Sequence, residues 1–308
     1  MGEALLIGVR FGMYLTLAAL FGLAAFGIYG LRIQERGTAI ALRLWLVPGA
    51  ALGLIFSVVW LPLEASLMAD LPLWPIDQGA VEALVADPSI GTAWSVRVAM
   101  LALAMLGATQ ARRSGIWLGV VTISSGAALA SLAWTGHGAV DAGVVGWVHL
   151  IADIFHLISA GVWVGALLGL LLLACRSATR VNAAHLKLTH RVLLQFGAVG
   201  TVVVATLIIT GLINSFMLVG LGNVITAATS RYGRLLIWKL AIFLIMLAIA
   251  SLNRFWITPG FEQSVVTGNY RHSLMVLRTS LLVEIAFIVL IIAVVTLLGI
   301  ETPPVSIS

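Results

Sequence analysis

The chain alternates long apolar runs with short polar segments from one end to the other. Each run approaches the length of about 20 residues that a helix needs to cross a bilayer, whereas a barrel strand alternates apolar and polar residues over about 10 positions. The pattern therefore predicts an all-α polytopic membrane protein, built as an eight-helix transmembrane bundle. The predicted spans are residues 6–30, 42–61, 92–110, 115–135, 146–175, 191–219, 233–252 and 276–299.

Composition leaves little sequence for anything besides this bundle. Of 308 residues, 61% are hydrophobic and 9% are charged, whereas soluble proteins average about 25% charged residues. We therefore interpret residues 1–308 as a single transmembrane domain. The lone cysteine, Cys175, excludes an intrachain disulfide and any cysteine-pair metal motif. Because the sequence has no phosphate-binding loop, nucleophile elbow or zinc-protease motif, we do not expect an enzyme.

One connection is longer than the others. We expect residues 62–91 to form an outer loop, because Pro62, Pro72 and Pro75 interrupt helical structure there. Within this loop, Asp77 is a suitable helix N-cap and Pro88 follows the last helical position. The loop is therefore predicted to contain a short helix that lies on the membrane surface.

Basic residues set the predicted orientation. The odd-numbered connections carry most of the lysines and arginines, whereas the even-numbered ones hold only Arg231 and Arg234. Because cytoplasmic loops are enriched in these residues, the odd connections are predicted to be cytoplasmic and both termini periplasmic. The net charge of +5 is then a topology signal, and the expected partner is the lipid bilayer rather than nucleic acid. His185, His190 and His272 lie in these basic segments, where we expect solvated or headgroup contacts.

Two short segments suggest an internal repeat. Gly91 precedes Arg97 by six residues at the start of the third span, and Gly233 precedes Lys239 by six at the start of the seventh. Both spans are predicted to run from outside to inside. This agrees with a four-plus-four duplication of the kind known in transporters.

Strongly polar residues inside the spans gather near the outer surface. At about 1.5 Å of rise per residue, five of them lie within about two turns of that surface. Ionisable groups in a bilayer are costly and usually functional, so this asymmetry predicts a polar cavity open to the outside, with Glu284 as its floor near mid-membrane. The alternative is that these groups only hold the bundle together. The five residues are Arg10, Arg97, Asp153, Asn214 and Lys239.

Histidines give this cavity a chemical character. His149, Asp153 and His156 are spaced so that one helix face presents all three side chains. His137 lies in the short Gly136-His137-Gly138 connection that leads into the same helix. Neutral imidazole is a common ligand of transition metals, and Asp153 is placed either to ligate a metal or to orient an imidazole. We therefore predict a metal site formed by His137, His149, His156 and Asp153.

Methionines favour copper as that metal. Met13, Met100 and Met217 each follow an outer-half polar residue by three positions, so each thioether shares a helix face with that residue. Thioether and imidazole together suit Cu(I), in preference to Cu(II), whereas zinc sites favour thiolate, imidazole and carboxylate. Methionine is also ordinary filler of membrane helices, so the role of these three as ligands is a hypothesis.

Several segments carry a resemblance to one family. They are the Gly136-His137-Gly138 connection, the helix from His149 to Gly165, and residues 91–97, 210–214, 232–240 and 252–254. Together they resemble the bacterial copper resistance protein D family (CopD/PcoD). The resemblance implies an eight-helix protein of the bacterial cytoplasmic (inner) membrane that handles copper, moves it inward and works with a periplasmic copper chaperone of the CopC type. Because the sequence contains no such partner, we expect it to be a separate protein.

Three functions stay open at this point. In the first, periplasmic copper enters beside His137 and His149 and moves toward the cytoplasm, although few ligands occupy the inner half. In the second, the protein is a haem-binding membrane redox protein that uses the same histidines. Because His149 and His156 are too far apart on one face for a single iron, haem needs His137 or a methionine opposite them. In the third, the polar residues serve only packing.

Overall fold

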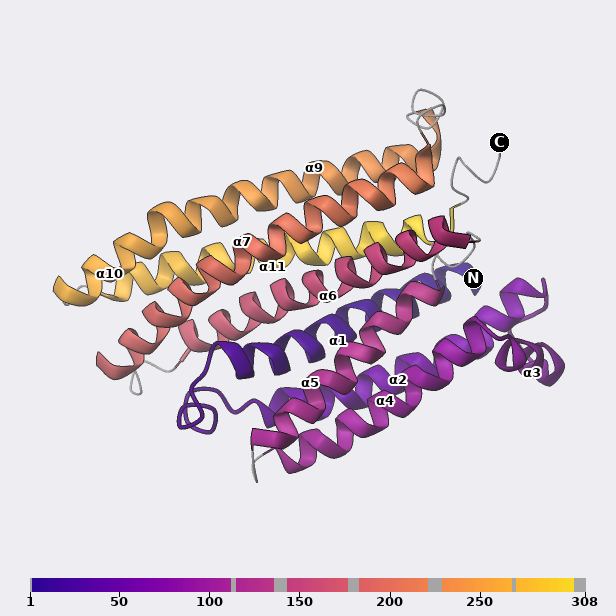
Figure 1. Cartoon of the computed structure of the whole chain (residues 1–308), viewed down its shortest axis with the longest axis horizontal. Coiled ribbons are helices and arrows are strands. Elements are labelled where there is room, and N and C mark those ends of the chain that lie inside the picture. The colour runs from indigo at the N-terminus through magenta and orange to yellow at the C-terminus, as the bar shows by residue number, and fades with distance from the viewer. Residues whose placement is uncertain are drawn as a thin grey trace.

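The structure is a computed structural model that describes residues 2–111, 115–135, 143–176, 183–220, 229–267 and 270–301. The regular elements of these residues are all helical (Figure 1). Eight of the helices are long and apolar enough to cross a membrane, which confirms the predicted bundle. In chain order the elements are α1 (Gly2–Tyr29), α2 (Arg43–Met68), α3 (Gln78–Ala86), α4 (Ile90–Gln110), α5 (Gly115–Ala130), the 3₁₀ helix η1 (Ser131–Thr135), α6 (Gly143–Ala174), α7 (Ala183–Val219), α9 (Arg231–Leu252), the π-helical turn η5 (Asn253–Ile257), α10 (Thr258–Thr267) and α11 (Tyr270–Leu298).

The second span ends later than predicted. α2 continues through Pro62 to Met68, so the expected loop from residue 62 is wrong at its start, and residues 69–77 alone connect α2 to α3. Leu61 and Leu63 are buried in this extension. Burial of apolar side chains and the neighbouring helices compensate for the one backbone hydrogen bond that a proline removes.

α7 also begins earlier than predicted, at Ala183 rather than at residue 191. Its first turns bury His185, whose Nε2 lies 3.0 Å from the carbonyl oxygen of Leu173 near the end of α6. The expectation of a solvated His185 is therefore wrong. The imidazole instead joins α7 to the C-terminal turn of the preceding helix.

The short surface helix is present as α3. Its N-cap is Asp77, whose Oδ1 accepts a hydrogen bond of 2.7 Å from the backbone N–H of Ala80, as predicted. Asp87 caps the next helix in turn, because its Oδ1 accepts from the backbone N–H of Ile90 at 2.7 Å. α3 packs on α2 and α4 and so covers one end of this part of the bundle (Figure 1).

α1 and α6 cross at the centre of the molecule through glycines. A Cβ added to Gly165 would lie 1.9 Å from the backbone carbon of Gly22, and one added to Gly22 would lie 2.0 Å from the carbonyl oxygen of Gly161. The two backbones therefore touch directly, which confirms that the small residues at 161–165 serve close helix packing.

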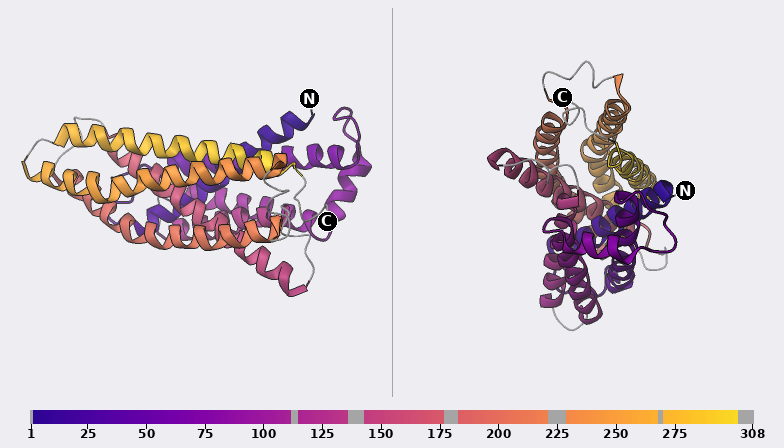
Figure 2. Two further views of the ribbon diagram at one scale, coloured as in Figure 1. Left: turned by 90° about the horizontal axis from the view of Figure 1, so that it is seen from above. Right: turned by 90° about the vertical axis from the view of Figure 1, so that its right-hand side faces the viewer.

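The helices form two groups of four with corresponding neighbours (Figure 2). In the first group, α1 packs on α2 and α5, and α4 packs on α5. In the second, α6 packs on α7 and α11, and α9 packs on α11. The groups differ in one contact, because α2 and α4 pack extensively whereas α7 and α9 do not. The two groups have the same order of neighbours apart from this contact, and the four-plus-four repeat stays a prediction.

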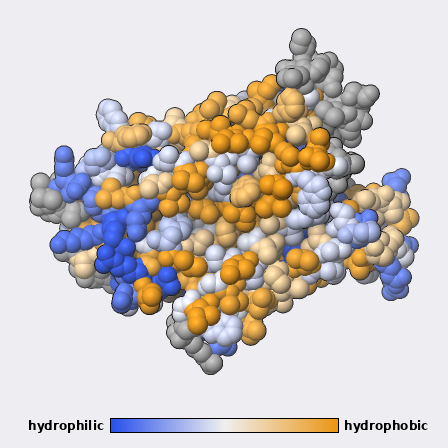
Figure 3. All heavy atoms as spheres, viewed as in Figure 1, coloured by the Kyte–Doolittle hydropathy of each residue, from blue (hydrophilic) through white to orange (hydrophobic). Residues whose placement is uncertain are grey.

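The first and last described residues, Gly2 and Glu301, lie at the same end of the bundle. Nη1 of Arg10 donates to the carbonyl oxygen of Gly299 at 2.9 Å, and Arg231 pairs with Glu301 at 3.1 Å. Hydrophilic side chains gather most strongly at the opposite end, to the left in Figure 3. Following the predicted orientation, we call the end that holds the termini the outer end and the opposite one the inner end.

Candidate functional site

Polar side chains of α6 point toward α7 in the outer half of the bundle. His149 is buried, with 2% of its surface exposed, and Asp153 and His156 follow it on the same face of the helix. Oδ1 of Asp153 accepts a hydrogen bond of 3.1 Å from Nδ2 of Asn214 on α7. Nδ1 of His156 lies 2.9 Å from Oγ1 of Thr210, one turn earlier on α7. Two hydrogen bonds, one from Asp153 and one from His156, therefore fix this face of α6 against α7.

Thr210 indicates which nitrogen of His156 carries the proton. Its Oγ1 donates to the carbonyl oxygen of Thr206 at 2.6 Å, which uses the single hydroxyl hydrogen. The hydroxyl oxygen then accepts from Nδ1–H of His156. This arrangement favours the tautomer in which Nε2 keeps a lone pair, the state that a metal ligand requires.

Asp153 is the electrostatic centre of the outer half. It interacts with Lys239 of α9 and with His149 of its own helix. Tyr14 of α1 and Tyr232 of α9 also interact electrostatically with Asp153. Groups from α1, α6, α7 and α9 thus interact with one carboxyl group, and the interaction with Lys239 is attractive.

A second polar cluster lies between α1, α2 and α4. Arg97 is fully buried, and its Nη1 donates to the sulfur of Met13 at 3.3 Å while its Nε donates to Oγ of Ser131 at 3.0 Å. The guanidinium also lies over the ring of Trp60, 5.2 Å from its centroid. Oγ of Ser57 is 3.9 Å from the same sulfur. The thioether of Met13 therefore serves as an acceptor for a cation and a hydroxyl.

This geometry argues against Met13 as a copper ligand. A guanidinium 3.3 Å from the sulfur repels a second positive charge at that atom. Met100 on α4 and Met217 on α7 are half-buried, and Met100 packs against the hydrophobic core. His137 lies outside the described residues. Within the described ranges, no three His, Cys, Asp or Glu side chains form a cluster that could hold a metal ion.

Glu284 is not the floor of this outer cluster. Its Oε1 accepts a hydrogen bond from Nδ2 of Asn253, which directly follows α9 at the inner end. Asn253 is 14 positions after Lys239, which corresponds to about 21 Å along a helix. The carboxyl is buried, with 1% exposed, and belongs to the inner half.

Thr210, Tyr14 and Tyr232 are contributors that the residue types alone did not indicate. For Thr210 a signal was present, because it precedes Asn214 by four positions and so shares its helix face. Tyr14 gave no comparable signal. Tyr14 interacts with both Asp153 and Arg97 because α1 lies between the cluster on α6 and the cluster around Arg97. The packing of α1 on α6 shows this, and the sequence does not.

Two family descriptions match the sequence. "Copper resistance protein D-like, N-terminal domain" matches residues 1–147, and "Copper resistance protein D" matches residues 190–298. A curated relative, copper resistance protein D of Pseudomonas syringae pv. tomato, is 38% identical over 306 residues, which cover 98% of each chain. The chain belongs to the copper resistance protein D family.

More distant relatives agree with this assignment. Inner membrane protein YebZ of Escherichia coli (strain K12) is 25% identical over 260 residues, covering 83% of this chain and 86% of the relative. Copper transport protein CutJ of Bacillus subtilis (strain 168) is 25% identical over 182 residues, covering 57% of this chain and 32% of the relative. No solved structure matches the chain significantly. The protein is thus a copper-related, multi-pass protein of the inner membrane.

Proposed function

We propose that this protein binds periplasmic copper at the outer half of α6 and moves it toward the cytoplasm. The observation that carries the proposal is the hydrogen bond between His156 and Thr210. It orients an imidazole with its Nε2 lone pair available, on the same helix face as a carboxylate and a second histidine. In a copper resistance family, the ion that suits this imidazole site is copper.

The ligands that we propose are His149 near the outer end and His156 about 10 Å deeper along α6, which copper meets in turn, with Asp153 between them as a ligand or as the group that orients them. Nδ2 of Asn214 donates a hydrogen bond to Asp153, and His137, which precedes α6 in the sequence, is a further candidate ligand. A reduced ion accepts thioether donors, so Met217, three positions after Asn214, and Met100 are further candidates. Met13 is left out, because Arg97 occupies its sulfur.

The charge at Asp153 makes a cation site in the membrane feasible. Lys239 places a positive charge near the carboxylate. Copper that binds beside His156 shares this carboxylate with Lys239, so occupancy by the metal weakens the attraction between α6 and α9. Because α7 and α9 pack little on each other, few contacts between these two helices oppose such a change.

The path inward runs along α9 rather than along α1. The direct backbone contact of Gly22 with Gly165 leaves no room for an ion between α1 and α6. On α9, Lys239, Met246 and Asn253 recur every seven residues and therefore share one face. Met246 is buried, and Asn253 donates to Glu284. This stripe offers a thioether, an amide and a carboxyl in sequence from the outer cluster to the inner half.

Haem is not favoured by the geometry of α6. His149 and His156 are seven positions apart, about 10 Å along the helix, so they cannot bind one iron from opposite sides. His185, near the start of α7, lies at the inner end, where its Nε2 contacts the carbonyl oxygen of Leu173. An absorption spectrum of the purified protein without a Soret band is the expected result.

Anaerobic Cu(I) titration of the purified protein tests the binding step. We expect the double variant His149→Ala/His156→Ala to lose the bound copper of the unmodified protein. The matched control is His272→Ala, which removes an exposed histidine on α11. Equal stoichiometry and affinity in all three proteins would overturn the proposed site.

Movement of copper is tested separately in proteoliposomes loaded with a Cu(I) indicator. The unmodified protein should admit copper from outside, and it should do so faster when a CopC-type periplasmic protein supplies the ion. Such a donor is the partner that we propose. If the unmodified protein binds copper but admits none to the proteoliposomes, the proposed binding site stands and the proposed transport function is wrong.

A further inference from the structure

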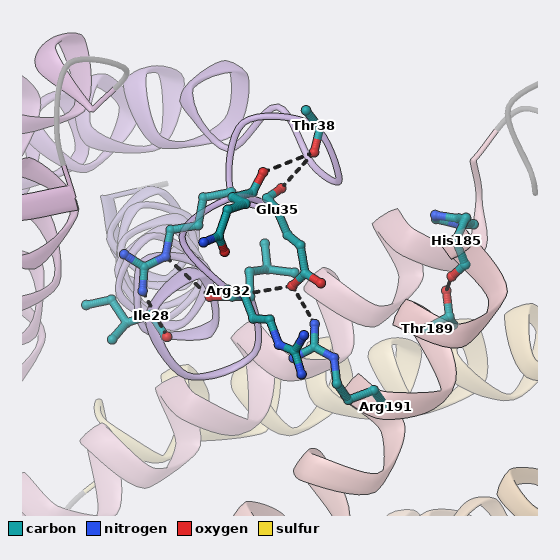
Figure 4. Close-up of polar contacts among 10 residues, drawn as sticks. Ile28, Arg32, Glu35, Thr38, His185, Thr189 and Arg191 are labelled. Carbon is teal, nitrogen blue, oxygen red and sulfur yellow. Dashed lines mark hydrogen bonds and ion pairs between the residues drawn. The ribbon is translucent and has the colours of Figure 1, made fainter. Parts of the chain in front are cut away.

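A basic hollow opens at the inner end, where α1 ends beside α7. Figure 4 shows the polar contacts near it. Its volume is about 450 Å³. The residues that line it come from the last turn of α1, from the loop that follows and from one face of α7. They are Ile28, Tyr29, Leu31, Arg32, Ile33, Gln34, Arg36, Arg191 and Gln195.

Positive charge exceeds negative charge in this hollow. Three arginines line it, and one carboxylate, Glu35, lies between two of them in Figure 4. Glu35 pairs with Arg191 and accepts from the backbone N–H of Arg32 at 2.8 Å. Arg36 donates to the carbonyl oxygens of Ile28 and Leu31 and so caps the C-terminus of α1. Three guanidinium groups against one carboxylate leave two positive charges uncompensated.

Hydrogen-bond donors in the hollow lack acceptors. The hydroxyl of Tyr29 is buried and has no hydrogen-bond partner within the part of the chain that the structure describes. The side chain of Arg32 is exposed and makes no hydrogen bond or ion pair to another described side chain. A buried hydroxyl without a partner is costly, so a ligand that supplies an acceptor to it is favourable. An oxyanion supplies acceptors for both groups at once.

Neighbouring side chains place the mouth of the hollow at the bilayer interface. Ile33 on its rim is 74% exposed, and Leu44 and Trp45 in the first turn of α2 are 66% and 51% exposed. Large apolar groups of this exposure require lipid around them, and tryptophan prefers the headgroup level. The arginines therefore lie at the depth of lipid phosphates rather than in bulk solvent.

We propose that this hollow binds the phosphate group of an anionic phospholipid. Arg32 and Arg191 donate charged hydrogen bonds to the phosphate oxygens, as guanidinium groups do in phosphate sites generally. The Tyr29 hydroxyl donates a third bond, and Arg36 adds charge while it caps α1. The acyl chains then continue along Ile28 and Ile33. Since Arg32 follows α1 and Arg191 belongs to α7, the bound lipid joins the two groups of helices at the inner end.

Thermal unfolding of the purified protein with added lipid tests this proposal without copper. Phosphatidylglycerol should raise the melting temperature of the unmodified protein more than phosphatidylcholine does. Because one arginine near an anionic lipid contributes about 1 kcal/mol, Arg32→Gln should weaken the apparent affinity about fivefold. Tyr29→Phe should weaken it as well. The matched control is Arg271→Gln, which removes an exposed arginine of α11 outside the hollow and should leave the affinity unchanged.

Two results would overturn the proposal. Equal weakening in Arg32→Gln and Arg271→Gln would indicate a diffuse basic surface instead of a site. An equal gain in melting temperature with inorganic phosphate at the same concentration would assign the hollow to a free anion instead of a lipid. Counting lipids retained in native mass spectrometry provides a second readout, in which the Arg32→Gln protein should keep fewer phosphatidylglycerol molecules than the control.

Discussion

The hydroxyl of Thr210 lies 2.9 Å from Nδ1 of His156 and donates its own hydrogen bond to the carbonyl oxygen of Thr206. A hydroxyl that donates to this carbonyl oxygen accepts from the imidazole, which favours the tautomer with the proton on Nδ1 and orients the ring. Groups that orient a ligand in this way contribute to metal affinity without touching the metal.

Thr210→Val should therefore weaken copper binding while both proposed histidine ligands are still present. The loss of an orienting partner typically costs about 10- to 100-fold in metal affinity. Thr210→Ser keeps the hydroxyl and should restore the affinity. Cu(I) titration against a competing chelator measures the effect. Thr206→Val, one turn away and with its hydroxyl bonded to Val202, is the control that should bind normally.

Met13 provides the opposite prediction. Its sulfur accepts from Arg97 and Ser57, so Met13→Leu should leave copper stoichiometry unchanged. The substitution should instead lower the folding stability, because the buried Nη1 of Arg97 loses its acceptor. A buried donor without a partner destabilises the folded state by about 1–3 kcal/mol. The same titration decides the first point and thermal unfolding decides the second. Loss of a bound copper ion in Met13→Leu would return the thioether to the ligand set.

The polar residues of α6 and Met13 show what the sequence pattern can and cannot predict for the site. The i, i+4 and i+3 spacing of His149, Asp153 and His156 was sufficient to place them on one face. The same rule applied to Met13 and Arg10 says only that they share a face of α1, and not which neighbour that face meets. Met13 meets Arg97, because α4 packs on α2 and α2 packs on α1.

The fold was more predictable than the site for a physical reason. Span number follows from bilayer thickness and hydropathy, which act on about 20 residues at once. Helix ends depend on single side chains and their local packing. α2 continues past Pro62 because Leu61 and Leu63 are buried, and α7 starts early because the imidazole of His185 contacts the carbonyl oxygen of Leu173. Neither contact is visible in a hydropathy pattern.

The contact of α1 with α6 predicts a strong effect from one methyl group. Gly165→Ala places a Cβ 1.9 Å from the backbone of Gly22, and backbone atoms cannot move aside as a flexible side chain can. Overpacking of this kind costs about 1–3 kcal/mol or more. Gly8→Ala, on α1 with open space around the new methyl group, is the matched control. Equal melting temperatures for the two variants in detergent would contradict the close crossing.

The inner pair of Glu284 and Asn253 predicts a double-mutant result. Asn253→Leu removes the amide that donates to the buried carboxyl, whose other oxygen, Oε2, already lacks a partner among the described residues. Stranding such a group costs about 1–3 kcal/mol, whereas replacing both partners by apolar residues is close to neutral. Asn253→Leu should therefore lower the melting temperature, and Asn253→Leu/Glu284→Leu should recover most of it.

Copper titration of the same variants separates stability from binding. The pair lies about 20 Å below Lys239, so Cu(I) affinity at the α6 site should be unchanged in both variants. Movement of copper in proteoliposomes should nevertheless fall in the double variant, because the path along α9 loses its last oxygen donors. A double variant that is no more stable than Asn253→Leu would show that the amide is not the partner that makes burial of Glu284 tolerable.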